Sequence, residues 1–164
     1  MPPALSLYDW LLFLHVFAAF ALVAALIVFW IVGIAARNVD RPVESLRYFR
    51  VAQPANVLVV IGTLGTFIFG IWLAIERDAY QVWDGWILAA LVLWAVASET
   101  GRRGGLPYME AKKLAERLAS EGRADEPSPE LHAKLKDRNG MMLNALSSLA
   151  VLLLLLDMIY KPGA

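Results

Sequence analysis

Long runs of apolar residues dominate the chain and are separated by short charged segments. Two of these runs, 10–36 and 51–75, contain no charged residue and exceed the ~20 residues that a helix needs to cross the hydrocarbon core of a bilayer. A third run, 139–160, includes five consecutive leucines and a single aspartate near its end. The pattern therefore predicts membrane-spanning helices at about 9–36, 52–75 and 139–160.

A fourth and shorter apolar run occupies residues 85–98. It is too short to cross a membrane alone, but Trp83 on one side and residues 99–102 on the other extend it to the required length. We therefore predict a span at about 83–102. Together the four spans predict an all-α, polytopic membrane protein in which residues 1–164 form one domain, a four-transmembrane-helix bundle.

Lys and Arg are distributed unevenly between the two ends of such a bundle. With four crossings, the N-terminus, the second loop and the C-terminus share one side, while the first and third loops share the other. Thirteen of the fifteen basic residues fall in the first and third loops, and only Arg77 and Lys161 fall on the opposite side. The positive-inside rule then places both termini outside and both basic loops in the cytoplasm. We expect the lipid bilayer of a bacterial cytoplasmic (inner) membrane to be the main partner.

The composition agrees with a lipid environment and argues against several classes of function. Hydrophobic residues make up 59% of the 164 residues, and the formal net charge is zero. A soluble domain has only about 45–50%. The chain has no cysteine, which excludes disulfides, thiolate metal sites and iron–sulfur clusters. No nucleotide-binding loop, Ser/His/Asp triad or HExxH zinc motif is present. The sequence therefore favours a protein that is not an enzyme, and we expect no nucleic-acid partner.

Small residues mark the predicted packing faces of the first two helices. On a helical wheel, His15 shares its face of the first helix with alanines and a glycine, whereas phenylalanines and isoleucines occupy the opposite face. The second helix carries a stripe of small residues: Ala55, Gly62, Gly65, Thr66 and Gly70. Because small residues let helices approach closely, these faces should point into the bundle. The same faces are candidates for a homo-oligomer or for contact with another membrane protein.

The third loop is too long to be a simple turn and predicts a surface helix. From Pro107 to Glu121, apolar residues recur at helical spacing between charges, which indicates an amphipathic helix lying on the cytoplasmic surface with Gly122 as its stop. Ser128 is a candidate N-cap for a helix that leads into the fourth span. A shorter surface helix is expected at 43–49 in the first loop.

Few ionisable or amide groups lie at membrane depth, and because such groups are costly there they are candidates for function. They fall into an outer layer of His15, Asp157 and Met158 and an inner layer, near the basic loops, of Gln53, Asn56, Glu99 and Asn144. Glu99 is followed three and four residues later by Arg102 and Arg103, which predicts an ion pair on one helix face.

His15 is the most informative of these groups, and three interpretations of it remain open. In the first, His15 bonds Asp157 or a backbone carbonyl and holds helices together. In the second, it ligates haem b, either with Met158 or alone with an open position. In the third, it binds a metal or relays protons. The other histidine, His132, falls in the third loop on the opposite side, where we interpret it as a solvated residue, so the two histidines cannot ligate one haem within a monomer.

Several segments carry a resemblance to known families: residues 11–16 (Leu-Leu-Phe-Leu-His-Val), the basic first loop, the glycine-rich second helix and residues 157–162 (Asp-Met-Ile-Tyr-Lys-Pro). Across nearly its whole length the chain resembles a bacterial family of small predicted integral membrane proteins of unknown function. More distantly, the Leu-His pair in the first helix is similar to the copper resistance protein D and membrane-bound protoporphyrinogen oxidase families. There the histidine is tied to copper transport or haem, and the resemblance implies such a role for His15 only.

Three functions are compatible with these patterns. The first is an integral membrane protein of unknown biochemical role, acting as an accessory or oligomeric component. The second is a haem- or porphyrin-associated redox protein that uses His15. The third is a component that transports a metal or small solute.

Overall fold

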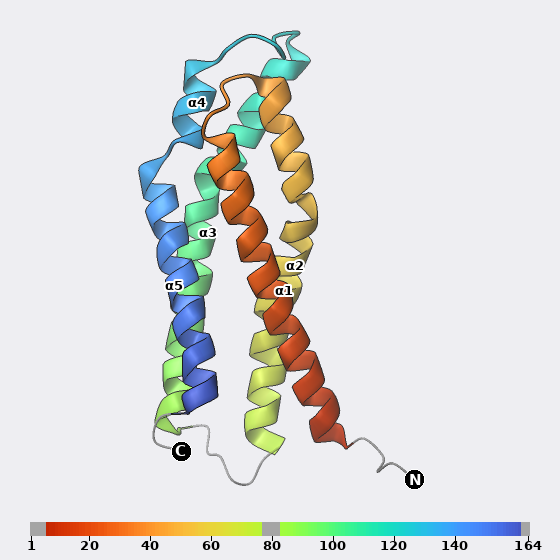
Figure 1. Cartoon of the computed structure of the whole chain (residues 1–164), viewed down its shortest axis with the longest axis vertical. Helices are drawn as coiled ribbons and strands as arrows, with labels where there is room; N and C mark the ends of the chain where they lie inside the picture. The colour runs from red at the N-terminus through yellow and green to blue at the C-terminus, as the bar shows by residue number, and fades with distance from the viewer. Residues whose placement is uncertain (1–5, 77–82, 162–164) are drawn as a thin grey trace.

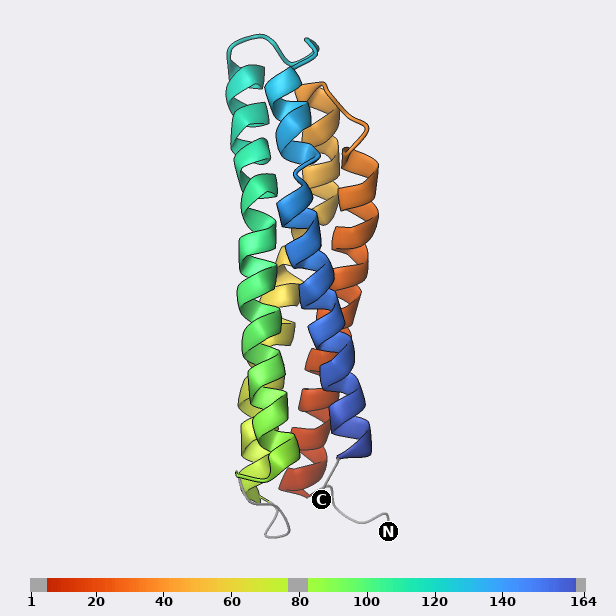
Figure 2. The same cartoon turned by 90° about the vertical axis from the view of Figure 1, so that its left-hand side faces the viewer.

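Helices account for nearly all of the regular structure. The computed structural model describes residues 6–76 and 83–161. Its long helices extend side by side between two ends of the molecule, with the short helix α4 near one of them (Figure 1 and Figure 2). The elements are α1 (Leu7–Ala36), α2 (Pro42–Glu76), α3 (Gly85–Ser120), α4 (Pro129–Leu135) and α5 (Arg138–Tyr160). The predicted all-α class is confirmed.

The helix ends gather in two groups. α1 begins, α2 ends, α3 begins and α5 ends at one end of the molecule, which we call the terminal end. The opposite end, which we call the loop end, contains the α1–α2 connection, the C-terminal part of α3, and α4 (Figure 1). The predicted grouping of the first and third loops at one end is therefore confirmed. Arg77, one of the two basic residues predicted for the other end, lies outside the described residues.

The long helices associate as two close pairs, α1 with α2 and α3 with α5, and the contact between the pairs is thinner. Small residues bring α1 and α2 together, because a Cβ added at Gly62 would lie 2.6 Å from the backbone nitrogen of Leu22. In the second pair, Ser147 of α5 donates a hydrogen bond to the Ala97 carbonyl at 2.8 Å. The predicted small-residue face of α2 is confirmed, and it packs inside the chain rather than at an outer surface.

Within residues 6–76 and 83–161, three helical segments are long and apolar enough to cross a membrane: α1, α2 and the segment Pro129–Tyr160 that includes α5. These correspond to three of the four predicted spans. α3 is not among them, because Glu99, Arg102 and Arg103 interrupt its apolar stretch. The phenylalanine and isoleucine face of α1 points outward, as predicted for a face in lipid, with Phe20 70% exposed.

The expected surface helix of the third loop is not a separate element. Pro107 lies inside α3, and residues 107–120 continue its axis to Ser120. The physical reason is that the apolar face of this segment has protein partners: Ala111, Leu114, Ala115 and Leu118 form one buried cluster with Ala36, Leu131 and Leu135. Likewise, the short helix expected at 43–49 is the first part of α2.

Backbone hydrogen bonds join the two connections at the loop end. Ser128 donates its backbone N–H to the Asp40 carbonyl at 2.8 Å, and its side chain caps α4 as predicted. Gly122 ends α3 with a φ of 80°, which confirms the predicted stop. His132 was predicted to be solvated, but it is half-buried, with Nδ1 3.1 Å from the Val39 carbonyl. The loop end is therefore a packed structure.

Candidate functional site

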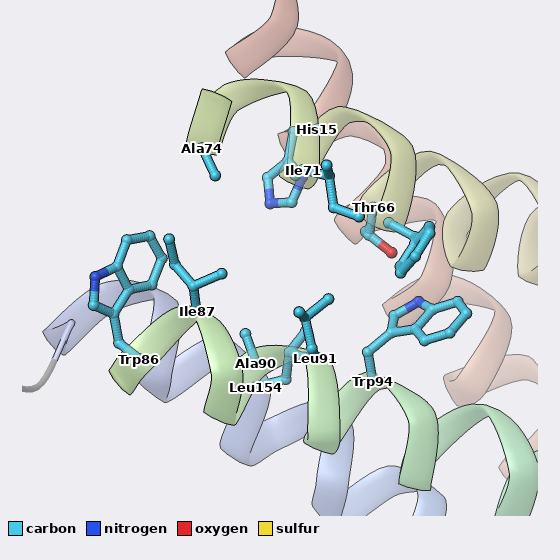
Figure 3. A pocket seen from close by; sticks show the side chains of 12 residues that line it. His15, Thr66, Ile71, Ala74, Trp86, Ile87, Ala90, Leu91, Trp94 and Leu154 are labelled. Atoms are coloured by element: carbon cyan, nitrogen blue, oxygen red, sulfur yellow. The ribbon is translucent and has the colours of Figure 1, made fainter. Parts of the chain in front are cut away.

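A small cavity of about 90 Å³ lies between the two helix pairs, toward the terminal end. All four long helices contribute to its walls (Figure 3). Its lining residues are His15 from α1, Thr66, Phe67, Gly70, Ile71 and Ala74 from α2, Trp86, Ile87, Ala90, Leu91 and Trp94 from α3, and Leu154 from α5. We call it the His15 cavity, because an imidazole is the main polar group in an otherwise apolar and aromatic lining.

The imidazole of His15 reaches the cavity over a glycine. A Cβ added at Gly70 would lie 3.0 Å from Cε1 and 3.3 Å from Nδ1 of His15, so Gly70 leaves the room that the ring occupies. The ring faces the backbone of Thr66, and Nδ1 is buried without a partner at hydrogen-bonding distance. The other ring nitrogen points into the open space between α2 and α3 (Figure 3).

Trp86 and Trp94, both from α3, form an aromatic wall across the cavity from His15 (Figure 3). The rings of Phe67 and Trp94 lie 4.4 Å apart, and Trp94 Nε1 donates a hydrogen bond to the Thr63 carbonyl at 3.1 Å. The Thr66 hydroxyl donates to the Gly62 carbonyl at 2.7 Å, inside its own helix. Both of these polar groups therefore have partners in the backbone of α2. His15 is left as the lining side chain best placed to bond a guest molecule.

The other outer-layer candidates do not line this cavity. Met158 is not a lining residue but packs against the cluster of Ala74, Trp86 and Ile87, which line the cavity. Oδ2 of Asp157 and Nδ1 of His15 are both buried without a hydrogen-bond partner among the described residues. These two atoms therefore do not form the bond that one interpretation of His15 predicted. The structure therefore brings His15 together with aromatic residues and not with Asp157 or Met158.

The inner-layer residues are spread over three helices. Glu99 accepts bonds from Arg102 at 2.9 Å and from Arg103 at 2.6 Å, which confirms the predicted ion pairs. Asn144 donates to the Gly104 carbonyl at 3.3 Å, between α5 and α3. Asn56 and Glu99 were both candidates for buried polar groups. Asn56 lies on the exposed side of α2 because Ala52 and Ala55 occupy the inward face, and the Glu99 side chain is 46% exposed. Glu99 therefore serves in local ion pairs, and Asn144 serves in a contact between helices.

A porphyrin does not fit the His15 cavity. Pockets that enclose an organic cofactor have volumes of about 300–1,000 Å³, several times the 90 Å³ found here. The proposed second ligand, Met158, is not among the lining residues. Within residues 6–76 and 83–161, no group of three or more His, Cys, Asp or Glu side chains could hold a metal ion. Neither haem nor a metal is therefore assigned to this site.

Sequence reasoning identified His15 but missed the aromatic wall. Trp86 and Trp94 are eight residues apart in the third apolar run, a spacing that places two side chains near one face of a helix. That spacing could have predicted an aromatic face on this helix. The role of Gly70 could not be read in this way, because its neighbour His15 is on another helix.

Comparison with known proteins supports the first of the two resemblances. Residues 9–162 match a family described as "Predicted integral membrane protein (DUF2269)". The comparison gives no evidence for the more distant likeness to copper resistance protein D or protoporphyrinogen oxidase. No curated protein and no solved structure matches the chain. Because the match covers nearly all of its length, this chain belongs to that family of predicted integral membrane proteins.

Proposed function

We propose that this protein is a four-span, non-enzymatic component of a bacterial cytoplasmic membrane, and that its His15 cavity binds the ring of a lipid-soluble phenol or quinol. The observation that carries the proposal is the imidazole of His15, which faces an apolar, aromatic cavity between two helix pairs.

The fourth crossing in this proposal is α3. Its apolar part packs against α5 through close contacts, because a Cβ at Gly101 would lie 2.9 Å from Ser147 Oγ. A helix that lies along a membrane span at this distance shares its depth in the bilayer. A crossing of about 20 residues that starts at Gly85 ends near residue 105, so Arg102 and Arg103 would lie near the headgroups. Glu99 would lie about 9 Å inside the core of that crossing from residue 105, where its ion pairs with both arginines offset the cost of its charge.

The orientation follows from the basic residues of the loop end, which favour the cytoplasmic side. The absence of cysteine allows a clean test, since each variant then carries one thiol only. We expect a membrane-impermeant thiol reagent to label Tyr160→Cys in intact cells and Asp125→Cys only after lysis. The reverse pattern would mean that the orientation is inverted. Labelling of both or of neither in intact cells would contradict a crossing by α5.

The chemistry of the cavity selects the ligand. Nδ1 lies on the α2 side against Gly70 and is closed off from the cavity, so in this proposal the neutral imidazole carries its proton on Nδ1. Nε2 is then an acceptor directed into the cavity, and it selects a guest that carries an O–H donor. The Phe67 and Trp94 rings favour a flat aromatic guest.

The size of the cavity limits the ligand further. An apolar cavity of about 150 Å³ can hold a benzene ring, so the 90 Å³ here admits a single ring only if part of it remains outside the cavity. Several lining side chains, among them Ile71 and Leu91, are partly exposed, so the cavity has an opening for such a molecule. The ligand would therefore have one ring in the cavity and any tail in the lipid.

The test compares 4-fluorophenol with fluorobenzene, which differ by the hydroxyl group. We expect fluorine NMR of the detergent-purified protein to show tighter binding of 4-fluorophenol. The net worth of one hydrogen bond, about 0.5–1.5 kcal/mol, corresponds to roughly a two- to tenfold difference in affinity. His15→Leu should remove that difference.

Two variants control this experiment. His132→Leu makes the same substitution at the loop end and should leave the preference for 4-fluorophenol unchanged. His15→Gln keeps a hydrogen-bond acceptor and should retain part of it. Equal binding of the two compounds by the unmodified protein would overturn the proposed role of His15.

A further inference from the structure

A second hollow, separate from the His15 cavity, lies between α2 and α3 near the loop end. It encloses about 310 Å³ and is lined by Leu46, Phe49, Arg50, Gln53, Lys112 and Glu116. We propose that this hollow, which we call the Arg50 groove, binds the phosphate of an anionic phospholipid. The proposal rests on different residues from the phenol or quinol site and stands independently of it.

The cations of the groove are available for a ligand. Among the described residues, Arg50 makes neither an ion pair nor a hydrogen bond with another side chain. Lys112 has one acidic neighbour, with Nζ 3.8 Å from Glu116 Oε1, whereas the Lys134–Glu110 pair closes to 2.7 Å. A phosphate between Arg50 and Lys112 would gain two charge-assisted contacts.

The depth of the groove matches a lipid headgroup. Twenty helical residues cover the ~30 Å hydrocarbon core, so a core that begins at the terminal end of α2 and α3 would end near residues 56 and 105. Arg50 and Lys112 lie about 9 and 10 Å beyond those points, at a rise of 1.5 Å per residue. Because both side chains are long, their charges can return to the level of the phosphates. Basic pockets between membrane helices on this side are known to suit anionic headgroups.

Exposed apolar residues continue from the groove toward the membrane. Val57 lies seven residues after Arg50 on the same face of α2 and is 59% exposed. Met109 lies three residues before Lys112 on α3 and is 57% exposed. A lipid whose phosphate is held in the groove would therefore have its glycerol region beside Met109 and an acyl chain against Val57. This juxtaposition of charge and apolar surface favours a phospholipid over a free phosphate ion.

The experiment measures lipid binding by native mass spectrometry of the full chain in a neutral detergent, with dioleoyl phosphatidylglycerol as the probe and dioleoyl phosphatidylcholine as the reference. An attraction of about 1 kcal/mol per basic residue corresponds to roughly a fivefold change in affinity. We therefore expect Arg50→Gln and Lys112→Gln each to weaken phosphatidylglycerol binding about fivefold. Glu116→Gln should strengthen it, because it removes the one carboxylate of the groove.

The matched control is Lys113→Gln, which removes a neighbouring exposed charge of α3 that does not line the groove. It should leave phosphatidylglycerol binding unchanged. Equal weakening by Lys113→Gln and Arg50→Gln would show diffuse attraction and overturn the site. Displacement of the lipid by millimolar inorganic phosphate would identify a free-phosphate site and overturn the assignment to a phospholipid. Unchanged thermal unfolding temperatures would establish that the variants are folded.

Discussion

The loop end and the membrane-depth part of the bundle place their large apolar side chains on opposite sides. At the loop end, Leu131 and Leu135 are completely buried. Along α1, Phe20 and Ile31 point outward and are 70% and 64% exposed, while alanines and glycines occupy the contacts between helices. The difference follows from the solvent on each side: water drives leucines inward, whereas lipid offers them an equally apolar surrounding.

This comparison also explains where the two candidate sites lie. At membrane depth, small residues bring α1 close to α2 and α3 close to α5. The two pairs approach each other less closely, and the His15 cavity remains between them. At the loop end, a core rich in leucine packs against Leu46 and Phe49, which also line the Arg50 groove together with its charged residues. A site for an apolar ring therefore lies at one level and a site for an anion at the other.

The largest expected effect comes from deleting the same atoms in the two regions. Leu131→Ala removes a completely buried side chain and should lower the free energy of unfolding by about 2–5 kcal/mol. Leu153→Ala removes a side chain that is 43% exposed on α5 and should cost far less in detergent. Thermal unfolding of the detergent-purified variants measures both. Equal losses in the free energy of unfolding would contradict the difference between the two regions, because they would mean that Leu131 and Leu153 are buried to the same degree.

The second effect tests the small-residue contact within the α1–α2 pair. A Cβ at Gly62 would lie 2.6 Å from the backbone nitrogen of Leu22, so Gly62→Ala forces two helices apart. Overpacking of this kind costs about 1–3 kcal/mol, and thermal unfolding should reveal it. Gly85→Ala is the matched control, since its added Cβ would contact no other part of the described structure within 4 Å. A stable Gly62→Ala variant would refute close packing at this point.

The sequence predicted the parts of this architecture that depend on local patterns. The apolar runs, the small-residue stripe of α2 and the Glu99 ion pairs all depend on spacing along one helix, and they are confirmed. The predicted crossing by α3 stays a prediction. The surface helix expected after Pro107 was wrong as a separate element, because its apolar face is covered by Leu131 and Leu135 rather than by lipid.

The candidate site was predictable only in part, for a related reason. His15 is visible as a polar group in an apolar run, but its neighbours come from three other helices. Asp157 and Met158 share its expected depth, yet depth alone does not say which face of α5 meets α1. The contact was decided by the pairing of α1 with α2 and of α3 with α5, which no local pattern encodes.

A third prediction concerns the hydrogen bonds that connect the two helix pairs. Trp94 of α3 donates to the Thr63 carbonyl of α2, and Trp30 of α1 donates to Ser148 of α5 at 2.8 Å. Trp94→Phe keeps an aromatic ring and loses the donor, so it should destabilise the protein by about 0.5–1.5 kcal/mol. Ser148→Ala tests the other contact in the same way. If neither variant lowers the unfolding temperature, these bonds do not hold the pairs together.

The smallest effect concerns an exposed ion pair of the loop end and depends on pH. Lys134 Nζ lies 2.7 Å from Glu110 Oε2, and this hydrogen bond raises the pKa of Lys134 above its ordinary value of 10.5. A cation with a raised pKa stabilises the fold fully below its unfolded pKa, and this contribution is lost as pH rises through the folded pKa. Lys134→Gln should therefore lower the unfolding temperature slightly at pH 8, and the difference from the unmodified protein should disappear above that folded pKa. Lys136→Gln, an exposed neighbour without a recorded ion pair among the described residues, should show no such pH-dependent difference. A deficit of Lys134→Gln that persists unchanged beyond the folded pKa would assign the effect to packing of the lysine stem rather than to its charge.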